Sequence, residues 1–226
     1  MEYPGRFIII GRDPNDDYNV VVYGLTGRSP PSRARKLVHC ANQRVEVQPT
    51  DEAAVSQGQR DLLIYPAIFY DTQGIAVSNG AQTLDVYTIS AIAPHPLTGI
   101  EEGLKDWNYE PDAPNFTPRI SGFVKDDDAV LSSIRKASND SRQFWKWPVV
   151  FQKGQGQFIS TYTGINQNPL PSFEGVPRDV SFSAGTHGGI AREVFSALNP
   201  EYRVAVAVLF QNRETKTYDI AIENRH

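Results

Sequence analysis

The sequence has 226 residues, of which 40% are hydrophobic and 21% charged, and its formal net charge is −4 at pH 7. These fractions are typical of globular proteins, and the length suits one large domain or two small ones. A pI near 5.6 argues against a general nucleic-acid binder, which needs a basic surface. A single cysteine, Cys40, excludes an intrachain disulfide and any zinc or iron–sulfur site built from several cysteines.

The sequence also lacks the segments that direct or anchor a protein elsewhere. The N-terminal residues do not combine a charged stretch, an apolar run and a cleavage site, as a secretory signal does. The longest apolar runs, residues 7–10 and 20–23, are much too short to cross a bilayer. No stretch is typical of a linker. We therefore expect one domain over residues 1–226, in the cytoplasm, with no nucleic-acid or membrane partner.

Strand patterns dominate the first third of the chain. Residues 6–12 and 18–26 flank the turn-forming DPNDD, so they predict a hairpin. Both runs carry three consecutive β-branched residues, which would place apolar groups on both faces, as in strands covered on both sides. Further strands are expected at residues 44–47, 62–70, 75–78, 119–124, 149–152 and 158–162, with a second hairpin at 203–211 and 218–223. The alternating aromatic residues at 144–147 are also typical of a strand.

Two segments have the periodicity of helices. In residues 99–109, apolar side chains share one face, and Thr98 with Glu101 matches a capping box. Residues 188–198 show the same spacing and end before Asn199-Pro200. Residues 83–93 form a weaker helical pattern because they are rich in β-branched residues. The sequence therefore predicts a mixed α and β protein in which a sheet has helices on one face and a second sheet on the other.

A basic segment stands out in this acidic chain. TGRSPPSRARK, residues 26–36, contains four cations, and Ser29 and Ser32 lie among them. Arginine presents a planar fork of donors that matches phosphate oxygens, and the serine hydroxyls can add further donors. A phosphate site and an ordinary solvated basic loop both fit this composition.

Two other segments carry polar groups where strands begin or end. Asn79, in VSNG, closes a predicted strand, where it favours either a turn or a contact with a ligand. In YEPDAPNFTPRISG, Glu110 and Asp112 follow a predicted helix, and Thr117 and Arg119 begin a predicted strand. A carboxylate beside an arginine is suited to general acid–base catalysis, and it is equally common as a surface ion pair.

The histidines do not form a recognisable catalytic or metal-binding motif. His187, in GTHGG, opens a predicted helix, where an anion site and a structural role are both possible. The four histidines are far apart and form no HExxH pair. We therefore expect no metal site.

Several blocks, in order over about the first 160 residues, resemble the archaeal-type IMP cyclohydrolase family. The blocks are YPGRF from Tyr3 with Gly11-Arg12, GRSPPSR from Gly27, YPA from Tyr65, AVSNG from Ala76, YEPD from Tyr109 with TPRI from Thr117, and FISTY from Phe158. Each block alone is weak, and their order makes the resemblance more specific. Beyond Tyr162 the resemblance adds little.

The resemblance implies a fold and a reaction. The fold is an α+β, four-layer αββα sandwich of the N-terminal-nucleophile-hydrolase type, with mostly antiparallel sheets and no use of a terminal nucleophile. The carboxamide nitrogen of 5-formamidoimidazole-4-carboxamide ribotide attacks the formyl carbon, and loss of water gives IMP in purine biosynthesis. This reaction needs no cofactor or metal. The partner is the small-molecule purine ribotide, and a homo-oligomer is possible.

The resemblance also assigns residues in this chain. Ile68 occupies a position where the family has a second active-site tyrosine, and Tyr70, on the same face of the strand, is expected to replace it. The alternatives are a related amide hydrolase and a non-catalytic nucleotide-binding protein on the same scaffold. The implied catalytic residues are Glu110, Arg33 and Tyr70, and the implied substrate-binding residues are Arg28, Ser29, Tyr65, Asn79, Thr117 and Arg119.

Overall fold

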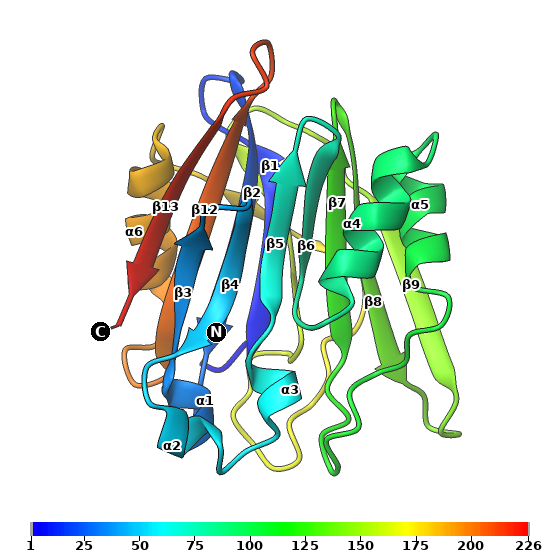
Figure 1. Cartoon of the computed structure of the whole chain (residues 1–226), viewed down its shortest axis with the longest axis vertical. Helices are drawn as coiled ribbons and strands as arrows, with labels where there is room; N and C mark the ends of the chain where they lie inside the picture. Colours follow the sequence, from blue (N-terminus) through cyan, green and yellow to red (C-terminus); the bar gives the residue numbers. More distant parts are fainter. Residues whose placement is uncertain (1, 226) are drawn as a thin grey trace.

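The computed structural model describes residues 2–225, which form two antiparallel sheets and six helices (Figure 1). One sheet has six strands, in the order β11 (Arg178–Ser181), β10 (Gln155–Ser160), β1 (Arg6–Arg12), β2 (Tyr18–Thr26), β12 (Arg203–Asn212) and β13 (Tyr218–Asn224). The other has seven, in the order β3 (Arg35–Cys40), β4 (Arg44–Pro49), β5 (Pro66–Asp71), β6 (Gly74–Ser78), β7 (Arg119–Lys125), β8 (Asp128–Lys136) and β9 (Arg142–Pro148). The predicted α+β class with mostly antiparallel sheets is confirmed.

The helices divide into three short and three longer ones. The short helices are α1 (Pro30–Arg33), α2 (Glu52–Val55) and α3 (Arg60–Leu63), and all three lie at one end of the molecule (Figure 1). The longer helices are α4 (Thr83–Ile92), α5 (Pro96–Gly103) and α6 (His187–Ala197). Helices α4 and α5 pack on the seven-stranded sheet, and α6 packs on β12 and β13 of the other sheet.

The two sheets pack against each other through a continuous apolar core. A Cβ placed on Gly122 in β7 would lie 2.7 Å from Ile10 Cδ1 in β1, so the sheets approach closely there. The other face of β7 packs Phe123 into a separate cluster with Val86 of α4 and Ile100 of α5. This arrangement explains why apolar and polar side chains do not alternate in residues 6–12 and 18–26, because these strands are buried on both faces.

At one side of the molecule a side chain joins the two sheets directly. The Asn224 amide accepts a hydrogen bond from the Leu37 backbone N–H at 2.9 Å and donates one to the Leu37 carbonyl at 3.0 Å. Asn224 ends β13 and Leu37 lies in β3, so a side chain of one sheet satisfies backbone groups in the edge strand of the other.

Several expected elements differ from the structure. The strand expected at residues 62–70 begins at Pro66, because α3 occupies the preceding residues. The helix expected at residues 99–109 spans Pro96–Gly103, and its N-cap is His95, whose Nδ1 accepts from Leu97 N–H at 3.1 Å. The strand expected at residues 149–152 is wrong, since these residues are irregular. The other expected strands and helices are present within a few residues of their bounds.

Three strands had no clear signal in the sequence. The β3 strand begins within the basic segment, and its sequence RKLVHC has no alternation of polar and apolar side chains. The β8 strand contains buried serines, and β11 is a short edge strand with mostly exposed residues. Hydrophobic periodicity predicts a strand when one face is apolar, so strands rich in polar residues and short edge strands are not predicted by it.

A glycine in β2 makes room for an aromatic ring in β1. Gly24 pairs directly with Phe7, and a Cβ placed on Gly24 would lie 1.9 Å from Phe7 Cζ. The Phe7 ring therefore lies across the glycine backbone, an arrangement that covers the surface a side chain would otherwise occupy.

We predict that Gly24→Ala lowers the free energy of unfolding by about 1–3 kcal/mol, because overpacking displaces the Phe7 ring. Urea unfolding should show this loss, and the double variant Phe7→Leu/Gly24→Ala should lose less than the sum of the single changes. The control is Gly188→Ala in α6, where the added Cβ meets nothing closer than 3.5 Å. If the loss in the double variant equalled the sum of the two single losses, the contact between the Phe7 ring and position 24 would be contradicted.

Buried tyrosines predict a loss of stability at alkaline pH. Burial raises the pKa of Tyr162 and of Tyr218, each to about 12. The unfolded chain loses these phenol protons near pH ~10, whereas the folded chain keeps them. The free energy of unfolding should therefore fall as pH rises from ~10 towards ~12. Urea unfolding between pH 8 and 11 checks this, with Tyr218→Phe expected to show a shallower decline, and equal slopes would contradict it.

Candidate active site

A pocket of about 360 Å³ opens at the end of the molecule that carries the short helices. This volume falls within the range of small-molecule sites, roughly 300–1,000 Å³. Its polar lining comes from three regions: the start of β1, the α1–α3 segment and the chain that precedes β7. These polar residues are Arg6, Ser29, Gln57, Gln59, Glu110 and Asp112.

A buried ion pair lies at the centre of this pocket. Arg6 Nη2 donates a hydrogen bond to Glu110 Oε1, and the two residues are 9% and 1% exposed. Asn79 Nδ2 donates to the same oxygen at 3.3 Å. Glu110 and Asn79 were predicted from the sequence, but Arg6 was not assigned a role. Its signal was present in the YPGRF block, where an arginine begins an otherwise apolar strand.

The surroundings of Glu110 act on its pKa in opposite directions, and the net effect is an increase. Burial raises the pKa of this carboxyl, while the Arg6 guanidinium acts in the opposite direction and the nearby Asp112 charge adds to the increase. A carboxyl group in a pocket, with a pKa raised by desolvation and specific charge partners, is a candidate for proton transfer. Glu110 is therefore the best acid–base candidate in the site.

Asn79 and Arg119 are brought together through Gln82. Asn79 Oδ1 accepts from Ile120 N–H at 2.8 Å and from Gln82 Nε2 at 3.0 Å. Arg119 Nη1 donates to Gln82 Oε1 at 2.9 Å. This network fixes the amide of Asn79, so that its donor faces Glu110. Gln82 had no signal of its own, because a glutamine after an Asn-Gly turn is unremarkable in sequence.

Thr117 links Asp112 to a buried tyrosine. The Thr117 N–H donates to Asp112 Oδ1 at 2.6 Å, and its hydroxyl contacts Asp112 Oδ2. The same hydroxyl lies 2.6 Å from the hydroxyl of Tyr162. Thr117 and Tyr162 are both buried. The predicted residue Thr117 therefore belongs to the site by orienting Asp112.

Tyr65 lies in the core, next to Tyr23. Its hydroxyl is 2.8 Å from that of Tyr23, and both side chains are buried. Tyr65 does not contribute to the pocket lining.

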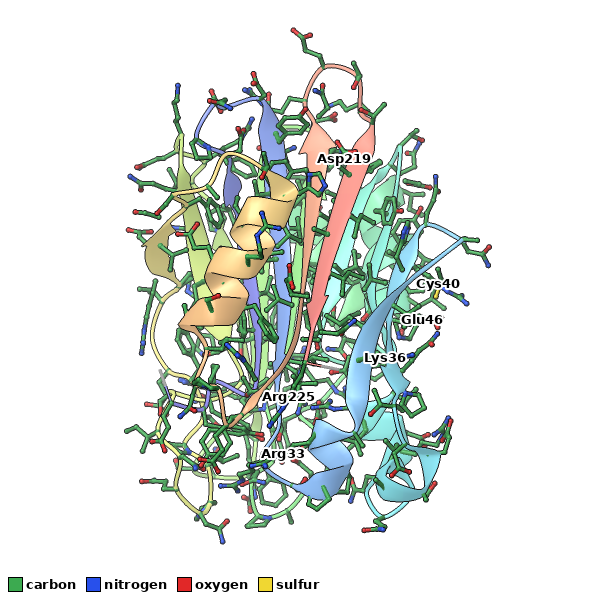
Figure 2. The ribbon with its side chains drawn as sticks, turned by 90° about the vertical axis from the view of Figure 1, so that its left-hand side faces the viewer. Arg33, Lys36, Cys40, Glu46, Asp219 and Arg225 are labelled. Carbon is green, nitrogen blue, oxygen red and sulfur yellow. The ribbon has the colours of Figure 1, made fainter. Side chains whose placement is uncertain are left out.

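The basic segment divides between the pocket and other contacts. Ser29 lines the pocket as the N-cap of α1. Arg28 Nη1 donates to Asn166 Oδ1 at 3.2 Å and to the Gln167 carbonyl at 2.9 Å. Arg33 Nε donates to the Gly27 carbonyl at 3.2 Å, and its Nη2 lies 3.5 Å from Glu201 Oε1. Figure 2 shows Arg33 beside α1, at the same end as the pocket.

Tyr70 lies away from this site. Its hydroxyl is 2.8 Å from His39 Nε2, and its ring centroid is 4.7 Å from that of Tyr218. It pairs with Ile75 at the far end of β5, about 16 Å along the chain from Tyr65 at ~3.3 Å per residue. The position of Tyr70 therefore does not support the expectation that it replaces the family tyrosine missing at Ile68. Ile68 itself is a buried core residue.

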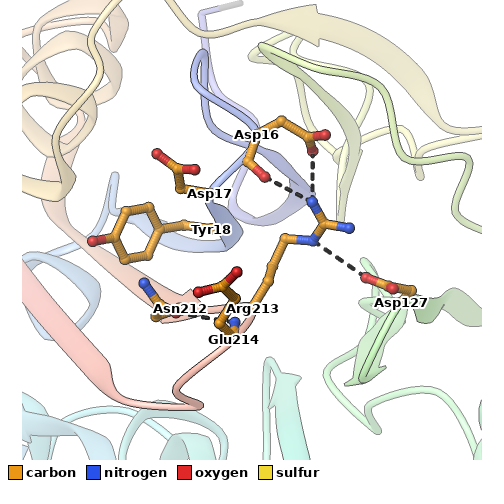
Figure 3. Close-up of a pocket in the computed structure, with 7 residues that line it drawn as sticks. All are labelled: Asp16, Asp17, Tyr18, Asp127, Asn212, Arg213 and Glu214. Carbon is orange, nitrogen blue, oxygen red and sulfur yellow. Dashed lines mark hydrogen bonds and ion pairs between the residues drawn. The ribbon is translucent and has the colours of Figure 1, made fainter.

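A second hollow, of about 420 Å³, lies at the opposite end, between the β1–β2 and β12–β13 turns (Figure 3). Arg213 crosses it, with Nη1 3.3 Å from Asp16 Oδ1 and Nε 3.3 Å from Asp127 Oδ1. Its lining comes from these turns, the adjoining strand ends and Asp127, and the ion pairs of Arg213 join them, which supports a structural role for this hollow. Among residues 2–225, no group of three or more His, Cys, Asp or Glu is placed to hold a metal ion.

His187 begins α6, as predicted, on the other sheet. Its ring packs edge-on to Phe210, with centroids 5.9 Å apart. This contact supports the structural interpretation of His187. Within the described residues, no helix has the length and apolar character needed to span a membrane.

Comparison with known proteins places the chain in a family. The model of the family described as "IMP cyclohydrolase-like protein" matches residues 3–216. The chain therefore belongs to the IMP cyclohydrolase-like family, and this membership supports a general cyclohydrolase-like function. A search of curated proteins finds no match to the chain.

The ion pair predicts an asymmetric response to mutation. Arg6→Met leaves the Glu110 carboxylate buried without its partner, so we expect a loss of about 3–5 kcal/mol in the free energy of unfolding. The double variant Arg6→Met/Glu110→Gln removes both charges and should recover part of that loss. Urea unfolding of the two variants at neutral pH measures the difference. A double variant less stable than Arg6→Met would contradict this account of the pair.

Proposed function

We propose that this protein closes the purine ring of 5-formamidoimidazole-4-carboxamide ribotide to give IMP and water. The observation that carries the proposal is the Glu110 carboxyl, which is buried beside Arg6 in a pocket of small-molecule size, with its pKa raised by burial. Ring closure needs such a group, because a proton must reach the formyl oxygen as the carboxamide nitrogen attacks.

Positioning supplies much of the catalysis in this proposal. Both reacting groups belong to one molecule, so the enzyme gains most by holding the formamido group against the carboxamide nitrogen. Arg6 and Asn79 both donate hydrogen bonds to Glu110 Oε1. A carboxyl with a fixed orientation delivers its proton to one position on the substrate.

The remaining predicted residues have binding and orienting roles in the proposal. Ser29 contacts the substrate directly, because it lines the pocket. Arg28 and Arg33 flank it in the basic segment and supply positive charge for the 5′-phosphate or the carboxamide oxygen. Arg119 orients Asn79 through Gln82, Thr117 orients Asp112, and Tyr65 is held in the core by its contact with Tyr23.

We also propose the finer properties that the resemblance implies. Two facing sheets with helices on their outer sides support the four-layer αββα sandwich of the N-terminal-nucleophile-hydrolase type. The substrate is a small ribotide, and the proposed reaction uses neither a cofactor nor a terminal nucleophile. A cytoplasmic location and a homo-oligomer remain part of the proposal.

We predict that Glu110→Gln lowers kcat by about 10²-fold or more, because the amide cannot transfer the proton. The measurement is the formation of IMP from the ribotide, followed by ultraviolet absorbance against a blank without enzyme. Glu101→Gln is the matched control, since Glu101 is exposed and pairs with Lys146 on the surface. Unchanged turnover in Glu110→Gln would remove Glu110 from the mechanism.

The IMP assay and binding calorimetry together distinguish ring closure from the two alternatives. A wild-type protein that binds IMP or the ribotide in calorimetry and forms no IMP would contradict ring closure. Hydrolysis of another amide would then favour a related amide hydrolase. Binding without any such reaction would favour a nucleotide-binding protein.

A further inference from the structure

The pocket contains a second carboxylate, to which the family resemblance assigns no role. Asp112 lies two residues after Glu110, and both line the same pocket. Asp112 is only partly buried, whereas Glu110 is 1% exposed. Two carboxyl groups in one site with different surroundings are suited to opposite proton-transfer roles.

Glu110 and Asp112 also differ in their hydrogen bonds. Glu110 interacts with a cation and an amide inside the protein, and burial raises the pKa of this carboxyl. Asp112 is partly open to solvent and accepts the Thr117 N–H at 2.6 Å. The Asp112 side chain is therefore held by Thr117 while part of it faces the pocket and the solvent.

A chain of hydroxyl groups holds Asp112 in place. The Thr117 hydroxyl contacts Asp112 Oδ2 and lies 2.6 Å from the Tyr162 hydroxyl. Tyr162 is itself fixed, because it is 3% exposed and its ring stacks on Tyr3 with centroids 6.0 Å apart. Each hydroxyl can donate one hydrogen bond and accept another, so the chain can end at Asp112 as acceptor.

We propose that Asp112 is a second catalytic carboxylate, which removes the proton from the attacking carboxamide nitrogen while Glu110 protonates the formyl oxygen. Thr117 and Tyr162 are positioning residues that act through Asp112. The inference rests on the proposed ring closure and extends it, because that function by itself requires only one acid–base group.

The proton transfers balance over the two stages. As the carboxamide nitrogen forms its bond to the formyl carbon, it gives a proton to Asp112, and Glu110 gives a proton to the oxygen. As the carbon–oxygen bond then breaks, Asp112 returns its proton to the departing water. The formamido nitrogen loses its proton to Glu110 as the carbon–nitrogen double bond forms. Both carboxyl groups end in their starting states.

Asp112 also shapes the local chain, so the test must separate this role from catalysis. Its backbone carbonyl accepts hydrogen bonds from Asn115 N–H at 3.0 Å and Phe116 N–H at 3.2 Å. Asp112→Asn retains the side-chain oxygen that accepts from Thr117 N–H, and it removes the basic group. Asp112→Ala removes the side chain and leaves space for a small carboxylate.

The experiment measures IMP formation by wild type, Asp112→Asn and Asp112→Ala, after calorimetry has shown that each binds IMP. We expect Asp112→Asn to lose about 10²-fold in kcat with KM little changed, as for the loss of a base. Added formate should restore part of the turnover of Asp112→Ala and should not affect Glu101→Gln. Thr117→Val should lower kcat, whereas Thr117→Ser, which keeps the hydroxyl, should restore it.

The outcomes distinguish this inference from the proposed function. If the wild-type protein forms no IMP, ring closure and the role of Asp112 both fall. If the wild type is active and Asp112→Asn keeps its kcat, only the role of Asp112 is overturned. An Asp112→Asn variant that no longer binds IMP, or an Asp112→Ala variant that formate does not restore, would assign Asp112 to binding or to the turn, and overturn the proton-transfer role.

Discussion

The site depends on one physical constraint, the burial of a carboxyl group against a guanidinium. Arg6 begins β1 of one sheet, and Glu110 lies in the chain that leads to β7 of the other, so their contact exists only when both sheets are in place. Removing each charge from water costs several kcal/mol, and that cost is offset only by good geometry and further hydrogen bonds. Asn79 supplies one such bond to Glu110, and Asn79 is itself held by Gln82 and by the Ile120 N–H.

The apolar core makes this constraint possible. Strands β1, β2 and β12 are buried on both faces, so the end of the sandwich is a rigid frame on which the loops of the pocket rest. The basic segment is partly held by this frame. Arg35 is buried, and its Nε and Nη2 donate to the Ser32 and Thr26 carbonyls at 2.8 and 3.3 Å. One of its cations therefore stabilises the loop, although the composition alone suggested four equivalent candidates for an anion.

The sequence was most informative where a single physical signal was strong. The two hairpins could be predicted from β-branched runs around turn residues, and their lack of alternation correctly indicated burial on both faces. Strand β8 was missed because its serines are buried in a polar contact with the neighbouring strand, where Ser132 Oγ lies 3.4 Å from the Ser121 carbonyl. The strand expected at residues 149–152 failed because short apolar runs carry little information on tertiary pairing.

By itself, the sequence determined the class of fold, its acidic balance and a set of polar residues at the ends of strands, because these follow from local composition and periodicity. Only the tertiary structure decided which of them meet. It joined Glu110 to Arg6 across 104 positions, brought Asp112 into the same pocket, and placed Tyr70 at the other end of β5. The physical reason is that burial and hydrogen-bond partners arise from contacts distant in sequence, and these contacts decide whether a carboxyl group is a surface charge or a proton donor.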